Sequence, residues 1–518
     1  MAQRVDLDAM IPREDFGVME ESYALDLMSD FPIRHLAKDA PVLRILRKPD
    51  FQRETNHWTP EQLVTFIESF LDNEVIPSLI LWKAPSYIFV IDGGHRLSAL
   101  RAWIENDYGD KHISRSFYKK DISNKQIAVA ERTRRLVESR VGRFADLTAL
   151  VDVKDASPVI LRRGQVAVTR ALPLQWIQGN ASAAETSFFK INSQGTPLDD
   201  TETLLIKNRR KPIAIGARAI VRAGSGHKYW SGFDREMVEQ IEEITGQLYE
   251  DVFKPEADDP VKTLELPLGG SVSPVDSLAL LIEFLDIAGT RVPGGKSITA
   301  YEDDSTGEQT VSVLRNSYQV LNRISGNSPG SLGLHPAVYF YNERGKYSRF
   351  LFLGMIAVIQ DKIRNNNRQW FRDFTDARAR LETFLVSNKS VIGMLLQNLA
   401  KGHRVKKIRD LLEFLVSELK DPLKTVTIEA GIAELGMSGR ILDVKITQTS
   451  PAITNETKTE IFLRQAIPRA LICPICGGAL DPKKSLTYDH VERVRDGGSG
   501  DVGNVQLAHP YCNTGYKS

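Results

Sequence analysis

The chain has 518 residues, of which 42% are hydrophobic and 26% charged, and its formal net charge is +1. This length exceeds one hydrophobic core and predicts about three domains. The near-zero net charge excludes a globally basic surface, so any contact with nucleic acid must come from a local patch. Residues 1–10 lack the apolar core of a signal peptide, and the longest apolar run, 350–360, is about half a membrane span. We therefore expect a cytoplasmic protein with no membrane partner.

The N-terminal part of the chain predicts a compact α/β unit. Residues 1–40 show no clear periodicity and are expected to form an arm or a short helical cap. Apolar residues at helical spacing predict a helix over 61–73, started by Thr59 and Pro60. Two β-branched and aromatic runs, 78–82 and 87–91, predict strands, and a second helix is expected over 96–106. We assign residues 41–222 to this domain.

The turn between the second strand and the second helix carries charged groups. It consists of Asp92, Gly93, Gly94, His95 and Arg96. Such a turn presents backbone amides, a carboxylate and a guanidinium to a bound anion. In the alternative interpretation, the turn is purely structural, with Asp92 capping the helix and Arg96 in a salt bridge.

Several motifs of this domain resemble the ParB/sulfiredoxin-like domains of bacterial defence proteins, including the regulatory half of GmrSD-type modification-dependent restriction enzymes. The similar segments are residues 49–53, 58, 76–77, 91–100 and 188–198. The family motif is usually Asp-Gly-Gln-Gln-Arg, and this chain keeps its aspartate, first glycine and arginine but neither glutamine. The resemblance implies a site that senses modified DNA or binds a nucleoside triphosphate, and the missing glutamines affect hydrolysis more than binding. Gln52 and Arg53 are expected to face the same pocket.

The middle of the chain combines a basic stretch with a series of helices. Lys207, Arg209, Arg210 and Lys211 begin a segment, 207–228, that has no acidic residue. Such a run is either a solvated face or a contact for the DNA phosphate backbone. We assign 223–450 to a mainly helical middle domain, with a connector of some strand character over 425–449. Its expected helices are 276–287, 311–324, 349–363, 370–386 and 408–419.

All three cysteines of the chain lie near its end and predict a metal site. Cys473 and Cys476 are separated by two residues, as are His509 and Cys512. Four such ligands satisfy tetrahedral zinc without an open position, so we expect a structural zinc ion. The alternative is a set of free thiols in a reducing cytosol.

Between and after these two half-sites lies a second set of polar residues. It comprises Asp489 and His490, the Gly497–Gly498 turn, Asn504, and Asn513 after the last cysteine. In this order the motifs resemble the HNH nucleases, whose fold is a β-hairpin and a helix around a metal. Two positions differ from many relatives, because His509 stands where cysteine is common and Asn513 where histidine is common. We assign the HNH domain to residues 451–518.

The chemistry of phosphodiester hydrolysis suggests a role for each of these residues. Neutral imidazole accepts a proton near pH 7, so His490 is the expected general base. The Asp489 carboxylate and the Asn513 amide oxygen suit Mg²⁺ or Mn²⁺. By resemblance, Asn504 braces the catalytic loop, and the products carry 5′-phosphate and 3′-hydroxyl ends.

The sequence thus predicts an α+β multidomain DNA endonuclease: a ParB/sulfiredoxin-like domain, a helical middle and a ββα-metal HNH module. The resemblance implies a restriction enzyme of phage defence that senses modified or foreign DNA. A nucleoside triphosphate, a second copy of the chain and partner proteins of a defence system remain open as partners. Two other functions remain open: an HNH nuclease of a mobile element or repair system, and a non-catalytic, zinc-containing DNA-binding adaptor.

Overall fold

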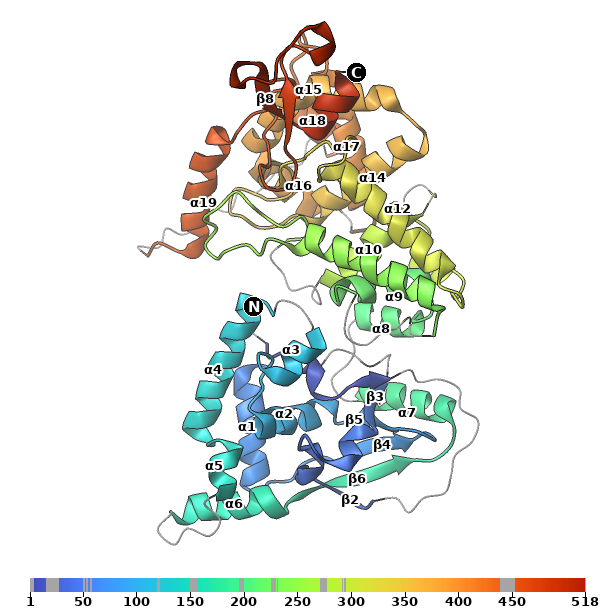
Figure 1. Cartoon of the computed structure of the whole chain (residues 1–518), viewed down its shortest axis with the longest axis vertical. Helices are drawn as coiled ribbons and strands as arrows, with labels where there is room; N and C mark the ends of the chain where they lie inside the picture. Colours follow the sequence, from blue (N-terminus) through green and yellow to red (C-terminus); the bar gives the residue numbers. More distant parts are fainter. Residues whose placement is uncertain are drawn as a thin grey trace. The chain divides into compact units, whose positions relative to one another are not determined.

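The protein forms two compact units, each with helices and strands (Figure 1). The computed structural model describes residues 4–14, 28–49, 52, 55, 58–118, 122–149, 157–194, 200–224, 230, 232–270, 277–290, 292, 295–399, 401–437 and 452–517. The first unit contains the described residues through Arg209. The second contains Arg210–Gly224 and the described residues from Trp230 onward. The helical middle and the terminal module therefore share one unit. The protein is α+β and mostly helical.

The first unit is built on a six-stranded mixed sheet with the strand order β1-β3-β5-β4-β6-β2. Its strands are β1 (Arg13–Glu14), β2 (Asp30–Pro32), β3 (Leu46–Pro49), β4 (Leu79–Lys83), β5 (Ile88–Asp92) and β6 (Ala171–Ile177). β5 pairs parallel with β3 and antiparallel with β4, and β4 pairs parallel with β6. The strands expected over 78–82 and 87–91 are confirmed as β4 and β5.

The two helices that the sequence predicts in the first unit, over 61–73 and 96–106, are confirmed, and the unit contains further helices that were not predicted. Its helices are α1 (Pro60–Leu71), α2 (Gly94–Glu105), α3 (His112–Tyr118), α4 (Asn124–Arg140), α5 (Phe144–Ala149), α6 (Pro158–Thr169), α7 (Ala181–Gln194) and α8 (Asp200–Lys207). At the start of α1, the Thr59 side chain accepts a hydrogen bond from the Gln62 amide, and the Gln62 side chain accepts one from the Thr59 amide. This capping box confirms the predicted start of α1.

Both faces of the sheet are covered at its centre. Ile88 and Val90 of β5 belong to the core formed with α1 and α2, whereas Phe89 and Ile91 pack in a second core with Phe188 of α7. Alternate residues of a strand point to opposite faces, so β5 is buried on both sides. This packing fixes the end of β5 and the turn that follows it.

The expectation of an N-terminal arm is wrong for the described residues before Pro41. Val5, Leu7 and Ile11 are buried in the main core of the first unit, and residues of this segment form β1 and β2. These stretches are too short to show a periodicity in sequence, and their neighbours in the sheet are distant along the chain.

The second unit is a helical assembly that carries the terminal hairpin. Its helices are α9 (Pro212–Val221), α10 (Arg235–Phe253), α11 (Leu278–Gly289), α12 (Glu308–Ile324), α13 (Pro336–Tyr339), α14 (Arg349–Arg364), α15 (Arg368–Ser387), α16 (Lys389–Asn398), α17 (Arg404–Leu419), α18 (Ile428–Glu434) and α19 (Asn455–Ala466). The five expected helices are confirmed as α11, α12, α14, α15 and α17. The described part of the expected connector is instead helical at α18, because Thr427 caps a helix there, and 438–449 lies outside the described residues.

α14 holds the longest apolar run and packs between α11 and α17. Among the described residues, no helix is long and apolar enough to cross a membrane. The terminal module consists of the antiparallel strands β7 (Thr487–His490) and β8 (Val505–Ala508), followed by a short π-helix, Cys512–Tyr516. It packs against α15 and the loop after α12: the Tyr511 amide donates to the Ser331 carbonyl, and the Tyr511 and Phe371 rings are in contact.

Candidate metal centre and active site

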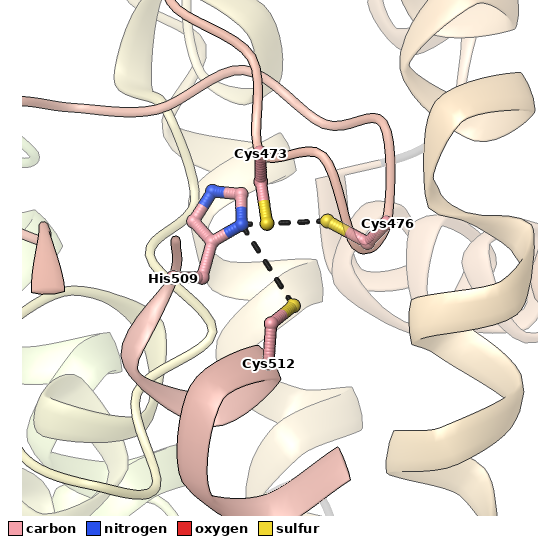
Figure 2. A group of neighbouring side chains, drawn as sticks. All are labelled: Cys473, Cys476, His509 and Cys512. Atoms are coloured by element: carbon pink, nitrogen blue, oxygen red, sulfur yellow. Dashed lines mark hydrogen bonds between the residues drawn. The ribbon is translucent and has the colours of Figure 1, made fainter. Parts of the chain in front are cut away.

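The four predicted zinc ligands lie together at the base of the terminal hairpin. Cys473, Cys476, His509 and Cys512 are all buried, and their ligand atoms lie within 4.8 Å of one another. Figure 2 shows the three sulfur atoms and the His509 Nδ1 atom gathered around one point. His509 Nδ1 is 3.4 Å from the Cys476 sulfur and 3.9 Å from the Cys512 sulfur. Ligand atoms around a tetrahedral zinc ion are about 3.3–3.8 Å apart, so the cluster fits zinc.

Two groups of the cluster, the Cys473 thiol and the His509 imidazole, are held in the forms that bind a metal, whereas contacts with Cys473 raise the pKa of the Cys476 and Cys512 thiols. Hydrogen bonds from Cys476 and Cys512 lower the pKa of the Cys473 thiol, which favours the thiolate. Burial, together with the nearby Arg378 cation, lowers the pKa of His509 and keeps its imidazole neutral. The His509 Nε2 atom lies 3.0 Å from the Ala479 carbonyl oxygen. A proton on Nε2 leaves Nδ1 free to bind zinc, and the carbonyl fixes the orientation of the ring.

A buried ion pair of α15 supports the turn that runs from Cys473 to Ala479, called the knuckle below. Glu382 accepts a hydrogen bond from the Ala479 amide at 2.7 Å and another from Arg378 Nε at 2.8 Å. A Cβ atom on Gly478 would lie 2.3 Å from Arg378 Nε, so this position requires glycine. Burial alone would lower the pKa of Arg378, but the charges of Glu382 and Cys476 raise it. The guanidinium therefore stays cationic and balances the net negative charge that three thiolates give to a zinc site.

Removing this cation should destabilise the second unit. Arg378→Ala leaves the Glu382 carboxylate buried without its ionic partner, which costs about 3–5 kcal/mol of unfolding free energy. Urea denaturation measures the loss, and Arg372→Ala, an exposed arginine of the same helix, serves as the control. Equal stability of the Arg378 and Arg372 variants would contradict the role of this ion pair.

Three of the four predicted catalytic residues, Asp489, His490 and Asn513, line a pocket of the module of about 290 Å³. Asp489 and His490 end strand β7, and Asn513 lies in the π-helix after Cys512. The Asp489 carboxylate is buried and accepts a hydrogen bond from Gln506 at 2.8 Å. The Asn513 amide nitrogen donates to the Tyr488 carbonyl at 3.0 Å. This bond does not use the amide oxygen of Asn513. The structure thus brings Asp489, His490 and Asn513 together.

Asn504 lies at the start of β8 and not in this pocket. Its side chain accepts a hydrogen bond from the Glu492 amide at 2.7 Å. It donates to the carbonyls of Glu492 and Ser499, at 3.0 and 2.6 Å. Asn504 therefore closes the loop that follows His490, a position consistent with the expected brace.

The Asp92–Arg96 turn lines a cavity of about 640 Å³ in the first unit. Gln52 lines the same cavity, and its buried Oε1 atom has no hydrogen-bond partner among the described residues. The rings of His95 and Trp58 stack with centroids 5.8 Å apart. Arg53, which was expected here, lies outside the described residues.

The charged groups of this turn pair with each other. Arg96 donates to the Asp92 carboxylate at 2.5 Å and to the Pro77 carbonyl. Gly93 has a φ of +96°, and a Cβ there would lie 2.4 Å from Leu79, so the turn requires glycine. The structural interpretation of the motif is confirmed in part: Arg96 forms a salt bridge as foreseen, whereas Asp92 is its partner and does not cap α2.

In its described part, 207–224, the basic stretch does not form one continuous exposed surface. Arg209 pairs with Glu185 at 2.7 Å, and Lys211 donates to the Thr299 and Tyr301 carbonyls. Arg218 and Arg222, farther along the stretch, are buried. Lys207 and Arg210 are exposed, and they remain the candidates for a contact with the DNA backbone.

Comparisons with known proteins match both ends of the chain. Residues 36–210 match the N-terminal domain of the GmrSD restriction endonuclease, and residues 473–518 match the HNH endonuclease family. Together the two matches support a GmrSD-type HNH restriction nuclease. It hydrolyses phosphodiester bonds, and its two matched domains imply DNA as the substrate. No curated protein and no solved structure matches the chain.

In this nuclease, several residues near the two sites were not foreseen from the sequence. Arg378 and Glu382 lie in a helix about 100 residues before the knuckle that they support. Lys517 and Arg493 line the pocket of His490. In the first unit, Phe66 lines the cavity of the Asp92–Arg96 turn from α1. Of these residues, only Lys517 could have been found from the sequence, because it follows Cys512 and Asn513 closely. The positions of the others depend on the tertiary fold.

Proposed function

We propose that this nuclease is a restriction enzyme of phage defence that responds to modified or foreign DNA through its first unit. The observation that carries the proposal is the cavity at the Asp92–Arg96 turn, within the GmrSD-type domain of a chain that ends in an HNH site. A nuclease needs a means to distinguish foreign DNA from its own, and a ligand-sized cavity in a separate unit suits that role.

In the proposed cleavage reaction, His490 accepts a proton from the attacking water. Asp489 and Asn513 would hold Mg²⁺ or Mn²⁺, since carboxylate and amide oxygens are hard ligands. When bound, the ion stabilises negative charge on the scissile phosphate and on the departing 3′ oxygen. Asn504 keeps the loop after His490 closed, which fixes the imidazole relative to Asp489. The zinc cluster has no open position and contributes structure only.

The lining of the cavity in the first unit favours a nucleotide as its ligand. Trp58 and His95 offer flat rings for stacking on a base, and Gln52 offers to a base N–H group an amide oxygen that has no partner among the described residues. The start of α2 at Gly94 lies beside them and favours an anionic phosphate. The nucleotide is either a modified base of DNA or a free nucleoside triphosphate, and both share this chemistry.

Digestion of matched phage and plasmid DNAs tests the proposal. Each DNA is prepared with and without modified bases and incubated with the full chain and Mg²⁺, with and without nucleoside triphosphates. Cleavage that depends on the modification or on the triphosphate supports the proposal. Equal cleavage of plain DNA in all arms favours a mobile-element or repair nuclease instead, and DNA binding without cleavage favours the zinc-containing adaptor.

Trp58→Ala should reduce substrate discrimination and spare the nuclease site. Loss of one stacking ring costs about 1–3 kcal/mol of ligand binding, or roughly 5- to 150-fold in affinity. The ratio of cleavage rates on modified and plain DNA measures the effect. Trp176→Ala, a half-buried tryptophan of β6 outside the cavity, is the matched control. If both variants discriminate like the parent, the cavity does not sense DNA.

A further inference from the structure

Lys517 contacts the residues that the proposed cleavage reaction needs. Its ammonium group lies 2.5 Å from Asp489 Oδ2 and 2.8 Å from the His490 carbonyl oxygen. The Asp489 side chain is 5% exposed and that of Lys517 is 22% exposed, so the pair is shielded from solvent. Arg493 donates to the Lys517 carbonyl and holds the backbone at this point.

The π-helix after the zinc cluster explains how Lys517 reaches this position. Cys512–Tyr516 closes with i→i+5 hydrogen bonds, a geometry that is rare and is often found at functional sites. Residues four or five apart lie on one face of such a helix. Asn513 and Lys517 are four apart, and both donate to β7, at the Tyr488 carbonyl and the Asp489 carboxylate. The zinc ligand Cys512 thus anchors a turn that delivers two groups to the active site.

The contact of Lys517 conflicts with binding of a divalent cation by Asp489. The Asp489 Oδ2 atom already accepts hydrogen bonds from Gln506 and Lys517. A cation bound to the same oxygen would lie within a few ångströms of the ammonium group, and two positive charges at that distance repel strongly. Lysine has a long flexible stem, so its ammonium group can leave without any change of the fold.

We infer that Lys517 competes with the catalytic divalent ion for Asp489, holding the carboxylate in place before the ion binds and moving to the scissile phosphate afterwards. This inference rests on the proposed role of Asp489 as a metal ligand. The surrounding pocket supports the proposed contact of Lys517 with the phosphate, because Arg493 and Arg495 line this pocket together with Lys517. Three cations next to His490 are suited to a phosphodiester.

Manganese binding to the zinc-replete full chain tests the competition, with electron paramagnetic resonance as the readout. Lys517→Met removes the competing charge and should lower the Kd for Mn²⁺ by about fivefold or more. At saturating Mn²⁺, single-turnover cleavage by this variant should fall by about tenfold or more, because a contact to the phosphate is lost. Lys483→Met makes the same change of charge at a surface pair with Glu265 outside the pocket and should alter neither value.

The outcomes separate a failure of the inference about Lys517 from a failure of the proposed metal site at Asp489. An unchanged or higher Kd in Lys517→Met would overturn the competition, and an unchanged cleavage rate would overturn the contact to the phosphate. If Asp489→Ala binds Mn²⁺ as the parent does, the proposed metal site itself is wrong, and the inference falls with it. Zinc content and thermal unfolding of each variant show whether the module has kept its fold.

Discussion

His490→Ala should abolish DNA cleavage while zinc content and folding stay intact. His490 ends strand β7 beside Asp489 and lines the pocket that contains Asn513 and Lys517. Loss of a general base costs about 10²–10⁴-fold in rate, and the half-buried imidazole is not a zinc ligand. Single-turnover cleavage at saturating Mg²⁺ measures the effect.

The matched control is His403→Ala, which removes an exposed imidazole of the same unit outside the pocket. This variant should cut like the parent. Substantial activity in a pure, metal-replete His490→Ala protein would show that another group accepts the proton.

Cys476→Ser should release zinc and unfold the terminal module. A structural zinc ion contributes on the order of 10 kcal/mol to folding, which exceeds the stability of a small domain. The loss of folded structure should spread beyond the module. The turn with Cys473 and Cys476 packs on Arg378 and Glu382 of α15, and Tyr511 contacts Phe371. Elemental analysis and thermal unfolding measure both effects.

Asp489→Ala is the contrasting variant, because it removes the proposed ligand of the catalytic ion and leaves the four zinc ligands untouched. It should keep its zinc and its unfolding temperature near those of the parent, yet lose Mg²⁺-dependent cleavage. A Cys476→Ser protein that stays folded and active without zinc would contradict the structural role of the cluster.

The features that sequence predicts best are those that short segments encode completely. The helix start at Thr59 and Pro60, the strands β4 and β5, and the two half-sites of the metal cluster each depend on residues a few positions apart. The zinc ligands could be paired across the hairpin because all the cysteines of the chain lie in that one region. Distances in the structure then agree with zinc.

Features that arise from packing could not be predicted in this way. Val5 and Ile11 look like part of a loose arm, yet they are buried because their partners come from α1 and α2. Arg378 is one of many arginines in sequence, and its burial against Gly478 depends on the fold of α15 beside the knuckle. One interpretation of the turn foresaw Arg96 in a salt bridge and Asp92 as a helix cap, and only the coordinates show that these two residues pair with each other.

The most direct test of the account compares one zinc-replete preparation with and without added Mg²⁺. The substrates are phage and plasmid DNAs with and without modified bases, in buffer freed of other divalent ions. We expect cleavage only in the presence of Mg²⁺ or Mn²⁺, with 5′-phosphate and 3′-hydroxyl ends on the fragments. If every DNA stays intact with Mg²⁺, or if zinc alone supports the same cleavage, a separate catalytic ion at Asp489 and His490 is contradicted.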